Sequence, residues 1–350
     1  MAVDCAGGTP HLHCSEGGFR VTRGFGAMLP ALLLPLLAAP CAALDFGLNL
    51  PCMNGTSGTG AFQPGVYNLS YGAAQLAHMR QLGFDSIRLP VNIVTANDPS
   101  SLATMRALVK GVGGSAVICM FGTGSLTTHG TGRVDSLPDA IGAWSKVHAA
   151  LGDLPGVKYE IFNEPHGYSL GCNSPPCGTP ASYLRDMRAV IAGAKLPEER
   201  CVLDSLGWAA DPQTLSKLGW GGSIGYHFYS WWLPANSTRQ EFSALFQLQL
   251  HGLSDRVYVT EFGGSLDSAN QDYEQPTTTD NNVNCLQGMD DAVQALRKKG
   301  KGIKGAFHWH GWMDGDSFSL FGAGNSNGRA KVLKVLEHCC GAAPAHGGVG

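Results

Sequence analysis

Short apolar runs alternate with segments of helical periodicity along most of this chain, and few folds accommodate that pattern. Eight runs have the length of buried strands: residues 44–50, 85–91, 115–122, 157–163, 201–207, 223–230, 256–263 and 303–310. Segments with helical periodicity lie between them, among them 71–83, 101–113, 139–152, 181–194 and 285–300. Strands that alternate with helices pair in parallel, so eight such units predict an α/β fold, a closed (β/α)8 TIM barrel.

A doubly wound open sheet is the main alternative to the barrel. That fold usually carries a G-x-G-x-x-G fingerprint after its first strand, and no such fingerprint follows residues 44–50. The chain has 350 residues, 44% of them hydrophobic, which is enough for one large core. We therefore expect a single catalytic domain at residues 44–340, followed by a loose tail at 341–350.

The first 43 residues read as a leader. Residues 28–43 form an apolar run that ends in small residues and follows Arg20 and Arg23. The run is too short and too rich in proline for a membrane span. A secretory signal cleaved near Ala43 fits it best, with an uncleaved anchor as the alternative. The expected location is therefore extracellular.

Cysteines and glycosylation triplets agree with secretion. An oxidising compartment would let several of the cysteines after residue 43 pair, and Cys172 and Cys177 are the best local candidates. Cys119 lies within an apolar run and is predicted to be a buried thiol. The N-glycosylation acceptors are Asn54, Asn68 and Asn236.

Polar side chains occur where the expected strands end. In a barrel of this kind the chemistry gathers at the carboxyl ends of the strands. The residues at those ends are Arg88, Asn163, Glu164, His227, Tyr229, Glu261 and Trp309. Any one of them, taken alone, is more often a solvated, ion-paired or core residue. Their joint occurrence at strand ends predicts that they converge on one site.

Two carboxylates that face each other across a pocket can break a glycosidic bond. One must donate a proton to the leaving oxygen, and the other must be ionised to attack or to activate water. Glu164 and Glu261 end the fourth and seventh expected strands. Arg88 is a plausible cation for Glu261, and Tyr229 could donate a hydrogen bond to the same carboxylate. Asn163 could hold the 2-hydroxyl group of a sugar.

Several tryptophans also lie at or just beyond strand ends. Flat aromatic faces suit the C–H faces of a sugar ring, and the indole N–H adds a polar contact. Trp309 is the strongest substrate-contact candidate, with Trp231 and Trp232 as further candidates. Filling gaps between loops is the alternative role for Trp231 and Trp232, and also for Trp208 and Trp312.

From about residue 44 to 336 the chain resembles glycoside hydrolase family 5, the cellulase family, in the larger clan of retaining barrel glycosidases. The resemblance is carried by the segments LGFDSIRLPV, IFNEP, YHFYS, VTEFGG and FHWHGW, in that order. It implies a retaining two-step reaction with Glu164 as the acid/base and Glu261 as the nucleophile. It also implies a strained Trp309–His310 peptide, for which the cis form is an option.

We expect a monomer that acts on a β-linked polysaccharide and uses no metal or cofactor. An endo-β-1,4-glucanase is the favoured activity, with β-mannanase and β-1,3-glucanase as alternatives. The net charge of −3, without a basic stripe, argues against nucleic acid as a partner. One departure from the family concerns a histidine that usually ends the third strand. Gly122 stands about there, and His129 could substitute for it.

Two rival functions remain open at this stage. The first is a barrel that binds carbohydrate without cleaving it, which the missing histidine would permit. The second is a metal hydrolase that uses His227, His308 and His310. Because side chains alternate along a strand, His308 and His310 should point away from Trp309 and its pocket.

Overall fold

The computed structural model describes residues 44–51, 66–67, 69, 71–122, 131–168, 172, 175–266, 279–312 and 316–321. The expected leader at 1–43, the tail at 341–350, His129 and two of the three glycosylation acceptors lie outside these ranges. The third acceptor, Asn236, is exposed, and its modification stays a prediction. Among the helices in the described ranges, none has the length and apolar content needed to cross a membrane.

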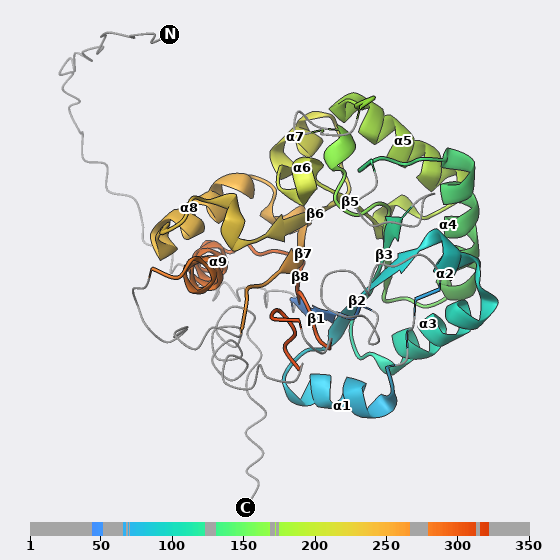
Figure 1. The fold of residues 1–350 in the computed structure, drawn as a ribbon, viewed down its shortest axis with the longest axis horizontal. Coiled ribbons are helices and arrows are strands. Elements are labelled where there is room, and N and C mark those ends of the chain that lie inside the picture. Colours follow the sequence, from blue (N-terminus) through green and yellow to red (C-terminus); the bar gives the residue numbers. More distant parts are fainter. Residues whose placement is uncertain are drawn as a thin grey trace, which may run out of the picture. The chain divides into compact units, whose positions relative to one another are not determined.

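Eight parallel strands close into a barrel in which each strand pairs with its neighbours in chain order and β8 pairs with β1 (Figure 1). The strands are β1 Asp45–Asn49, β2 Ser86–Asn92, β3 Ala116–Gly122, β4 Val157–Glu160, β5 Cys201–Asp204, β6 Ser223–Phe228, β7 Val257–Phe262 and β8 Gly305–His308. All eight fall within one residue of, or inside, the predicted runs. The predicted (β/α)8 barrel is therefore confirmed.

Helices surround the strands (Figure 1). Five match the predicted segments: α1 Ala73–Gln81, α3 Pro99–Gly111, α4 Leu137–Leu151, α5 Pro180–Gly193 and α9 Asn281–Lys298. The additional helices are α2 Ile93–Asn97, α6 Leu206–Ala209, α7 Pro212–Lys217 and α8 Arg239–Gln249. Helix α8 has a clear local cause. Thr238 and Glu241 form a reciprocal capping box, which satisfies backbone N–H groups at its start.

The fourth strand is shorter than the predicted run 157–163. Regular pairing ends at Glu160, and the Asn163 N–H then donates to the Met120 carbonyl at 2.9 Å. Glu164 has a φ of 49°, a left-handed conformation that ordinary residues seldom adopt. The chain therefore turns out of the sheet at the residue predicted to be catalytic.

The fifth and eighth strands also end earlier than predicted. Gly207 and Trp208, within α6, have φ values of 63° and 64°, so the backbone after β5 leaves the extended conformation. The Trp309–His310 peptide after β8 is cis, in agreement with the family resemblance. Turns at the carboxyl ends of strands thus replace the last residues of several predicted runs.

The barrel interior is layered. Val117, Val202, Tyr258 and Phe307 pack together as a small apolar cluster. Side chains two residues apart on a strand share a face, so Cys119, Asp204 and Thr260 follow on the same strands, toward the carboxyl ends. All three are fully buried. A polar layer inside the barrel therefore separates the apolar cluster from the mouth.

The cysteines behave largely as predicted. Cys172 and Cys177 form a disulfide, and Cys119 is a buried free thiol. Burial raises the pKa of the Cys119 thiol well above its usual value, so the sulfur stays protonated. Within the described ranges, Cys201 and Cys285 are also buried free thiols.

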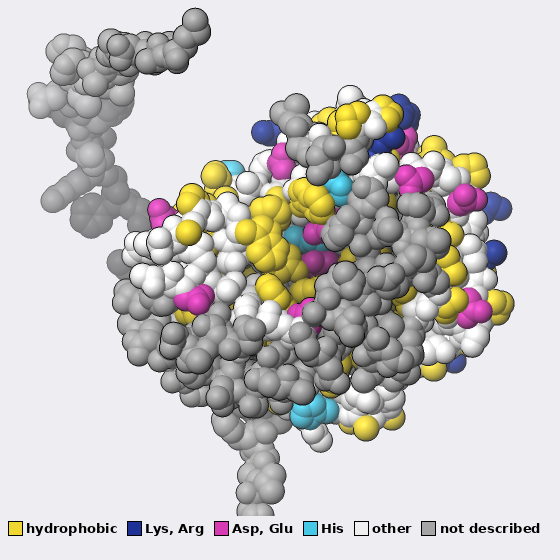
Figure 2. Space-filling view, in the orientation of Figure 1, with side chains coloured by type: hydrophobic (Ala, Val, Ile, Leu, Met, Phe, Trp, Pro, Cys, Tyr) yellow, Lys and Arg dark blue, Asp and Glu magenta, His cyan; other side chains and the backbone are white. Residues whose placement is uncertain are grey.

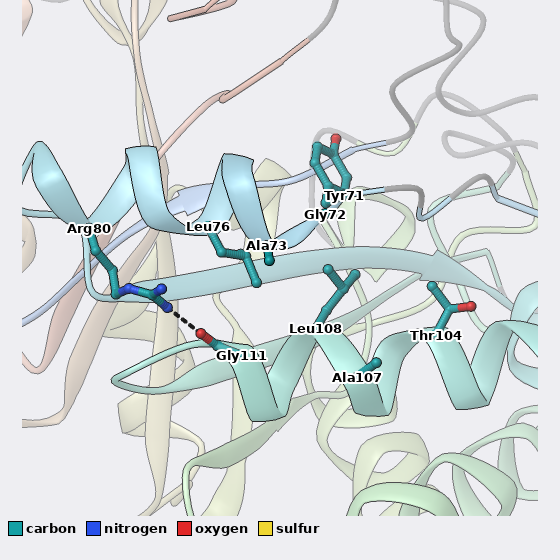
Figure 3. Close-up of a pocket in the computed structure, with 9 residues that line it drawn as sticks. All are labelled: Tyr71, Gly72, Ala73, Leu76, Arg80, Thr104, Ala107, Leu108 and Gly111. Atoms are coloured by element: carbon teal, nitrogen blue, oxygen red, sulfur yellow. Dashed lines mark hydrogen bonds between the residues drawn. The ribbon is translucent and has the colours of Figure 1, made fainter.

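A cavity of about 330 Å³ lies between α1 and α3, on the outside of the barrel (Figure 3). Its walls are largely aliphatic, and the Arg80 guanidinium donates to the Gly111 carbonyl at its edge. The lining residues are Tyr71, Gly72, Ala73, Leu76, Arg80, Thr104, Ala107, Leu108 and Gly111. None of the residues predicted to be catalytic lines this cavity.

Candidate active site

Acidic and histidine side chains lie at the bottom of an opening on one face of the molecule, with hydrophobic side chains along part of its rim (Figure 2). A carboxylate oxygen of Glu164, a carboxylate oxygen of Glu261 and a ring nitrogen of His227 lie within 4.8 Å of one another. The two acids are 97 residues apart in the chain (261 − 164). The barrel therefore brings together the two carboxyl groups that the sequence singled out, at a spacing close to that of retaining glycosidases.

Glu164 is held by its backbone as well as by its side chain. Its N–H donates to Oδ2 of Asp204 at 3.0 Å, which anchors the left-handed residue. Its Oε1 lies 3.1 Å from Nδ1 of His227. The side chain is 16% exposed, so a ligand in the opening can reach the carboxyl group.

Glu261 lies deeper, with a side chain only 6% exposed. Arg88 donates from Nη1 to Oε1 at 2.6 Å, and the Tyr229 hydroxyl donates to Oε2 at 2.8 Å. These are the two contacts that the sequence predicted. A register shift between Tyr226 and His227 pairs His227 with Glu261 across β6 and β7. Such bulges redirect side chains next to functional sites.

The charges around Glu261 work in opposite directions. Burial raises the pKa of Glu261 above its ordinary value, and the negative Glu164 adds to this effect. The Arg88 guanidinium and the Tyr229 hydrogen bond oppose it because they stabilise the ionised form, and His227 does the same only when it is protonated. Burial lowers the pKa of His227 to about 4, so this imidazole is neutral at neutral pH.

Arg88 links several strands at the base of the site and is fully buried. Its Nε and Nη2 donate to the two oxygens of Glu160 at 2.7 and 2.5 Å. It also donates to the Oδ1 atoms of Asn49 and Asn163, both at 2.7 Å. The guanidinium therefore positions β1, β4 and the nucleophile candidate together, and its loss would leave two acids without their cation.

Replacing Arg88 with methionine should lower the free energy of unfolding by about 3–5 kcal/mol, because it leaves buried carboxylates uncompensated. The matched control is Arg106→Met. Arg106 pairs with Asp153 at 2.6 Å on the surface, where the side chains are 32% and 63% exposed, and an exposed pair of this kind contributes little to stability. Urea unfolding of both variants measures the difference. Equal losses would contradict the assigned role of Arg88.

Asn163 has a donor available for a ligand. Arg88 holds its Oδ1, and its buried Nδ2 has no hydrogen-bond partner within the described ranges. A buried amide donor without a partner is unfavourable unless a ligand or water satisfies it. This geometry suits the predicted contact with a sugar hydroxyl.

The three candidate tryptophans have different surroundings. Trp231 is 55% exposed and stacks on Tyr229, with ring centroids 4.2 Å apart. Trp309 is half-buried and lies parallel to Phe121 with centroids 6.1 Å apart. Trp232 donates its indole N–H to the His227 carbonyl at 3.0 Å. Trp231 therefore offers an open aromatic face, whereas one role of Trp232 is to brace the end of β6.

Sequence reasoning missed Glu160 and Asp204. Both are fully buried, Glu160 at the end of β4 and Asp204 at the end of β5. A signal was present, because each is a lone acid inside an apolar run, YEIF for one and VLDS for the other. Charged side chains are almost never fully buried without a partner, so such an acid indicates a buried polar cluster.

Two groups of side chains have the spacing of metal ligands within the described residues. One is Glu160, Asp204 and His227, and the other is Glu164, His227 and Glu261. The positive Arg88 guanidinium already occupies oxygens of Glu160 and Glu261, so a divalent cation would meet both competition and repulsion there. Neither group includes His308 or His310, which the rival metal-hydrolase hypothesis required.

Comparisons with solved structures agree with the fold. The endo-β-1,4-glucanase of Xanthomonas axonopodis pv. citri, as a triple mutant, is similar with a TM-score of 0.58 and 13% identity, over 83% of this chain and 99% of that one. The endoglucanase Cel5A of Pseudomonas stutzeri, solved with cellobiose, has a TM-score of 0.57 and 14% identity over 87% and 94%.

An endocellulase from Pyrococcus horikoshii, solved as a variant with cellotetraose, has a TM-score of 0.58 and 15% identity, over 84% of this chain and 92% of that one. No protein-family model matches the chain, and no curated protein matches it either. At such low identity, these likenesses establish the barrel fold and leave the activity to be argued from the site.

Proposed function

We propose that this protein is a retaining β-glycosidase that cleaves β-glucan internally, with β-1,4-glucan as its first candidate substrate. The approach of Glu164 and Glu261 to within 4.8 Å carries the proposal. Retaining enzymes place their carboxyl groups about 5–5.5 Å apart, whereas inverting enzymes need about 6.5–9.5 Å to admit a water. The surroundings of the two acids also suit the acid/base and nucleophile roles. The Glu164 side chain can be reached from the opening, and the Glu261 carboxylate is held by the Arg88 and Tyr229 donors.

In the first step the ionised Glu261 attacks the anomeric carbon. The bond from that carbon to the leaving oxygen breaks, and Glu164 gives its proton to this oxygen. In the second step Glu164 takes a proton from water, the resulting hydroxyl bonds to the anomeric carbon, and Glu261 leaves as a carboxylate. Two inversions give net retention. Asn163 would hold the 2-hydroxyl through Nδ2, which has no hydrogen-bond partner among the described residues.

The choice of β-1,4-glucan draws on the comparisons and on one surface feature. Two of the similar structures contain cellobiose and cellotetraose. The exposed face of Trp231, next to Tyr229, suits stacking against a sugar ring. β-Mannan and β-1,3-glucan are the other candidate polymers, and we propose a secreted monomer as the working form.

A substrate panel tests this proposal. Wild type and Glu164→Ala are assayed on β-1,4-glucan, β-1,3-glucan, mannan and aryl β-glycosides, with viscosity and product length separating internal from terminal cleavage. Hydrolysis of β-1,4-glucan by wild type, with short oligosaccharides appearing early, is the expected result. A wild type that binds these sugars but cleaves none would instead identify a carbohydrate-binding barrel.

Replacing Tyr229 with phenylalanine should move the acidic limb of the pH profile upward. The hydroxyl donates to ionised Glu261, so its loss raises the pKa of that carboxyl group further. A higher pKa leaves less ionised nucleophile at a given acidic pH, and kcat/KM then falls at a higher pH than in wild type. The measurement is kcat/KM against pH for both proteins. An unmoved or lowered limb would exclude this role.

A further inference from the structure

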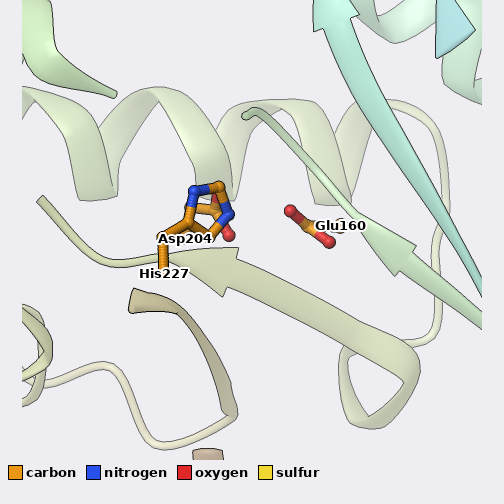
Figure 4. A group of neighbouring side chains, drawn as sticks. All are labelled: Glu160, Asp204 and His227. Carbon is orange, nitrogen blue, oxygen red and sulfur yellow. The ribbon is translucent and has the colours of Figure 1, made fainter. Parts of the chain in front are cut away.

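Asp204 is a buried carboxyl group that the proposed mechanism does not use. Asp204, at the end of β5, is fully buried inside the barrel, beside Glu160 and His227 (Figure 4). Its Oδ2 accepts the N–H of Glu164 at 3.0 Å. The same oxygen lies 3.6 Å from Nε2 of His227, which is too far for a hydrogen bond. Asp204 thus contacts the backbone of the acid/base candidate directly.

Two carboxyl groups lie close together here. A carboxylate oxygen of Asp204 and one of Glu160 are within 4.8 Å of each other. Two ionised carboxylates at that spacing repel each other, and burial strengthens the repulsion. A proton on one of the two removes this repulsion and is therefore favoured.

Neighbouring groups decide which carboxyl group holds that proton. Arg88 donates to both oxygens of Glu160, so Glu160 has the cation and stays ionised. Among the described residues, the Glu164 peptide N–H is the donor to Asp204, at Oδ2, and Oδ1 has no donor. An oxygen without a donor is unfavourable in an ionised carboxylate, but it is compatible with a protonated one.

Electrostatics agree with this assignment. Burial works to raise the pKa of Glu160, but the Arg88 guanidinium holds it below its ordinary value. Burial, with the negative charge of Glu160, raises the pKa of Asp204 well above its ordinary value. The neutral His227 adds no positive charge that would offset a second carboxylate.

The surrounding residues fit the Asp204 side chain closely. A Cβ atom added to Gly225 on β6 would lie 2.0 Å from Oδ1 of Asp204 and 3.1 Å from Oγ1 of Thr260 on β7. From outside the barrel, the Tyr183 hydroxyl of α5 donates to the Asp204 carbonyl at 2.7 Å. The backbone and the carboxyl group of Asp204 are therefore both held in place.

We infer that Asp204 is a positioning residue for the acid/base Glu164, and that its carboxyl group is protonated. Protonated Asp204 accepts the Glu164 N–H at Oδ2 and adds no second negative charge beside Glu160. It fixes the left-handed Glu164 without placing a further negative charge beside the catalytic pair. The catalytic part of this inference rests on the proposed glycosidase function.

The test compares Asp204→Asn with Asp204→Ala. A side-chain amide accepts and donates as a protonated carboxyl group does, so Asn should keep kcat within about threefold of wild type. Ala leaves the buried Glu164 N–H without an acceptor and should lower kcat roughly 10- to 100-fold, with a small change in KM. Asp290→Ala, which removes a buried carboxyl group from α9, is the control for general packing loss.

Two readouts are independent of catalysis. Infrared difference spectra of wild type against Asp204→Asn should show the loss of one carbonyl band from a protonated carboxylic acid. Hydrogen exchange at the Glu164 amide should accelerate in Asp204→Ala and stay slow in Asp204→Asn. Both measurements decide the inference even if wild type cleaves no glycoside, which would defeat only the proposed function.

Three results would overturn the inference. An Asn variant as impaired as the Ala variant would mean that an ionised Asp204 is required. An unchanged carbonyl band in Asp204→Asn would place the proton elsewhere. Equal Glu164 amide exchange in wild type and Asp204→Ala, in a variant that folds as shown by circular dichroism, would remove the positioning role.

Discussion

Replacing Glu261 with alanine should lower kcat on β-1,4-glucan by at least about 10⁴-fold, because no other group can form the bond to the anomeric carbon. Arg88 and Tyr229 both donate to this carboxylate, so the variant loses the nucleophile that these donors hold in place. The KM for the polymer should change little, since Glu261 is buried and most of the binding surface remains.

Added azide distinguishes loss of a nucleophile from loss of structure. Alanine leaves room for the small anion next to Arg88, and azide should restore turnover of an activated aryl β-glycoside to give the inverted α-glycosyl azide. The matched control is Glu199→Ala, which removes an exposed carboxylate from the surface. A folded Glu261→Ala protein that keeps substantial activity, or yields only β-glycosyl azide, would exclude Glu261 as the nucleophile.

Replacing Glu164 with alanine should have an effect that depends on the leaving group. General acid catalysis typically contributes about 10²–10⁴-fold, so hydrolysis of polymeric substrate should fall by that factor. Aryl glycosides with acidic phenols need no proton on departure, and they should still form the glycosyl-enzyme. Its slow breakdown would appear as a burst of released phenol, followed by a low steady rate.

The configuration of the product formed with azide also tests the role of Glu164. In Glu164→Ala the anion needs no general base, so it should attack the glycosyl-enzyme and give the β-glycosyl azide, with retained configuration. The opposite anomers from the two variants separate the roles of the two acids. Equal losses on polymer and on activated aryl glycoside, with no azide product, would contradict the acid/base assignment of Glu164.

Much of the barrel could be predicted from local patterns. A parallel strand buried on both faces is a short apolar run, and the helices between such runs have their own periodicity and caps. The active end of the barrel follows from chain direction alone, so Arg88, Glu164 and Glu261 could be placed together before any distance was known. Tyr229 could be placed with them as well, because it lies near the end of the expected strand at residues 223–230.

The buried pair of Glu160 and Asp204 depends on information that local patterns do not hold. Which side chains meet inside a barrel is set by the register between strands, and a bulge at His227 shifts that register beside β7. The position of Asp204 beside Glu160 also needs Gly225, because a larger residue there would occupy the space of the Asp204 carboxyl group. Likewise, the left-handed turn at Glu164 depends on an acceptor 40 residues away.

The configuration of the first product is the most direct test of the pairing of Glu164 with Glu261. Proton NMR recorded immediately after enzyme is added to an aryl β-cellobioside follows the anomeric signals before mutarotation mixes them. Two carboxyl groups with oxygens within 4.8 Å predict that β-cellobiose appears first and the α-anomer only later. If α-cellobiose appears first, a water attacks directly, and Glu261 is not the nucleophile.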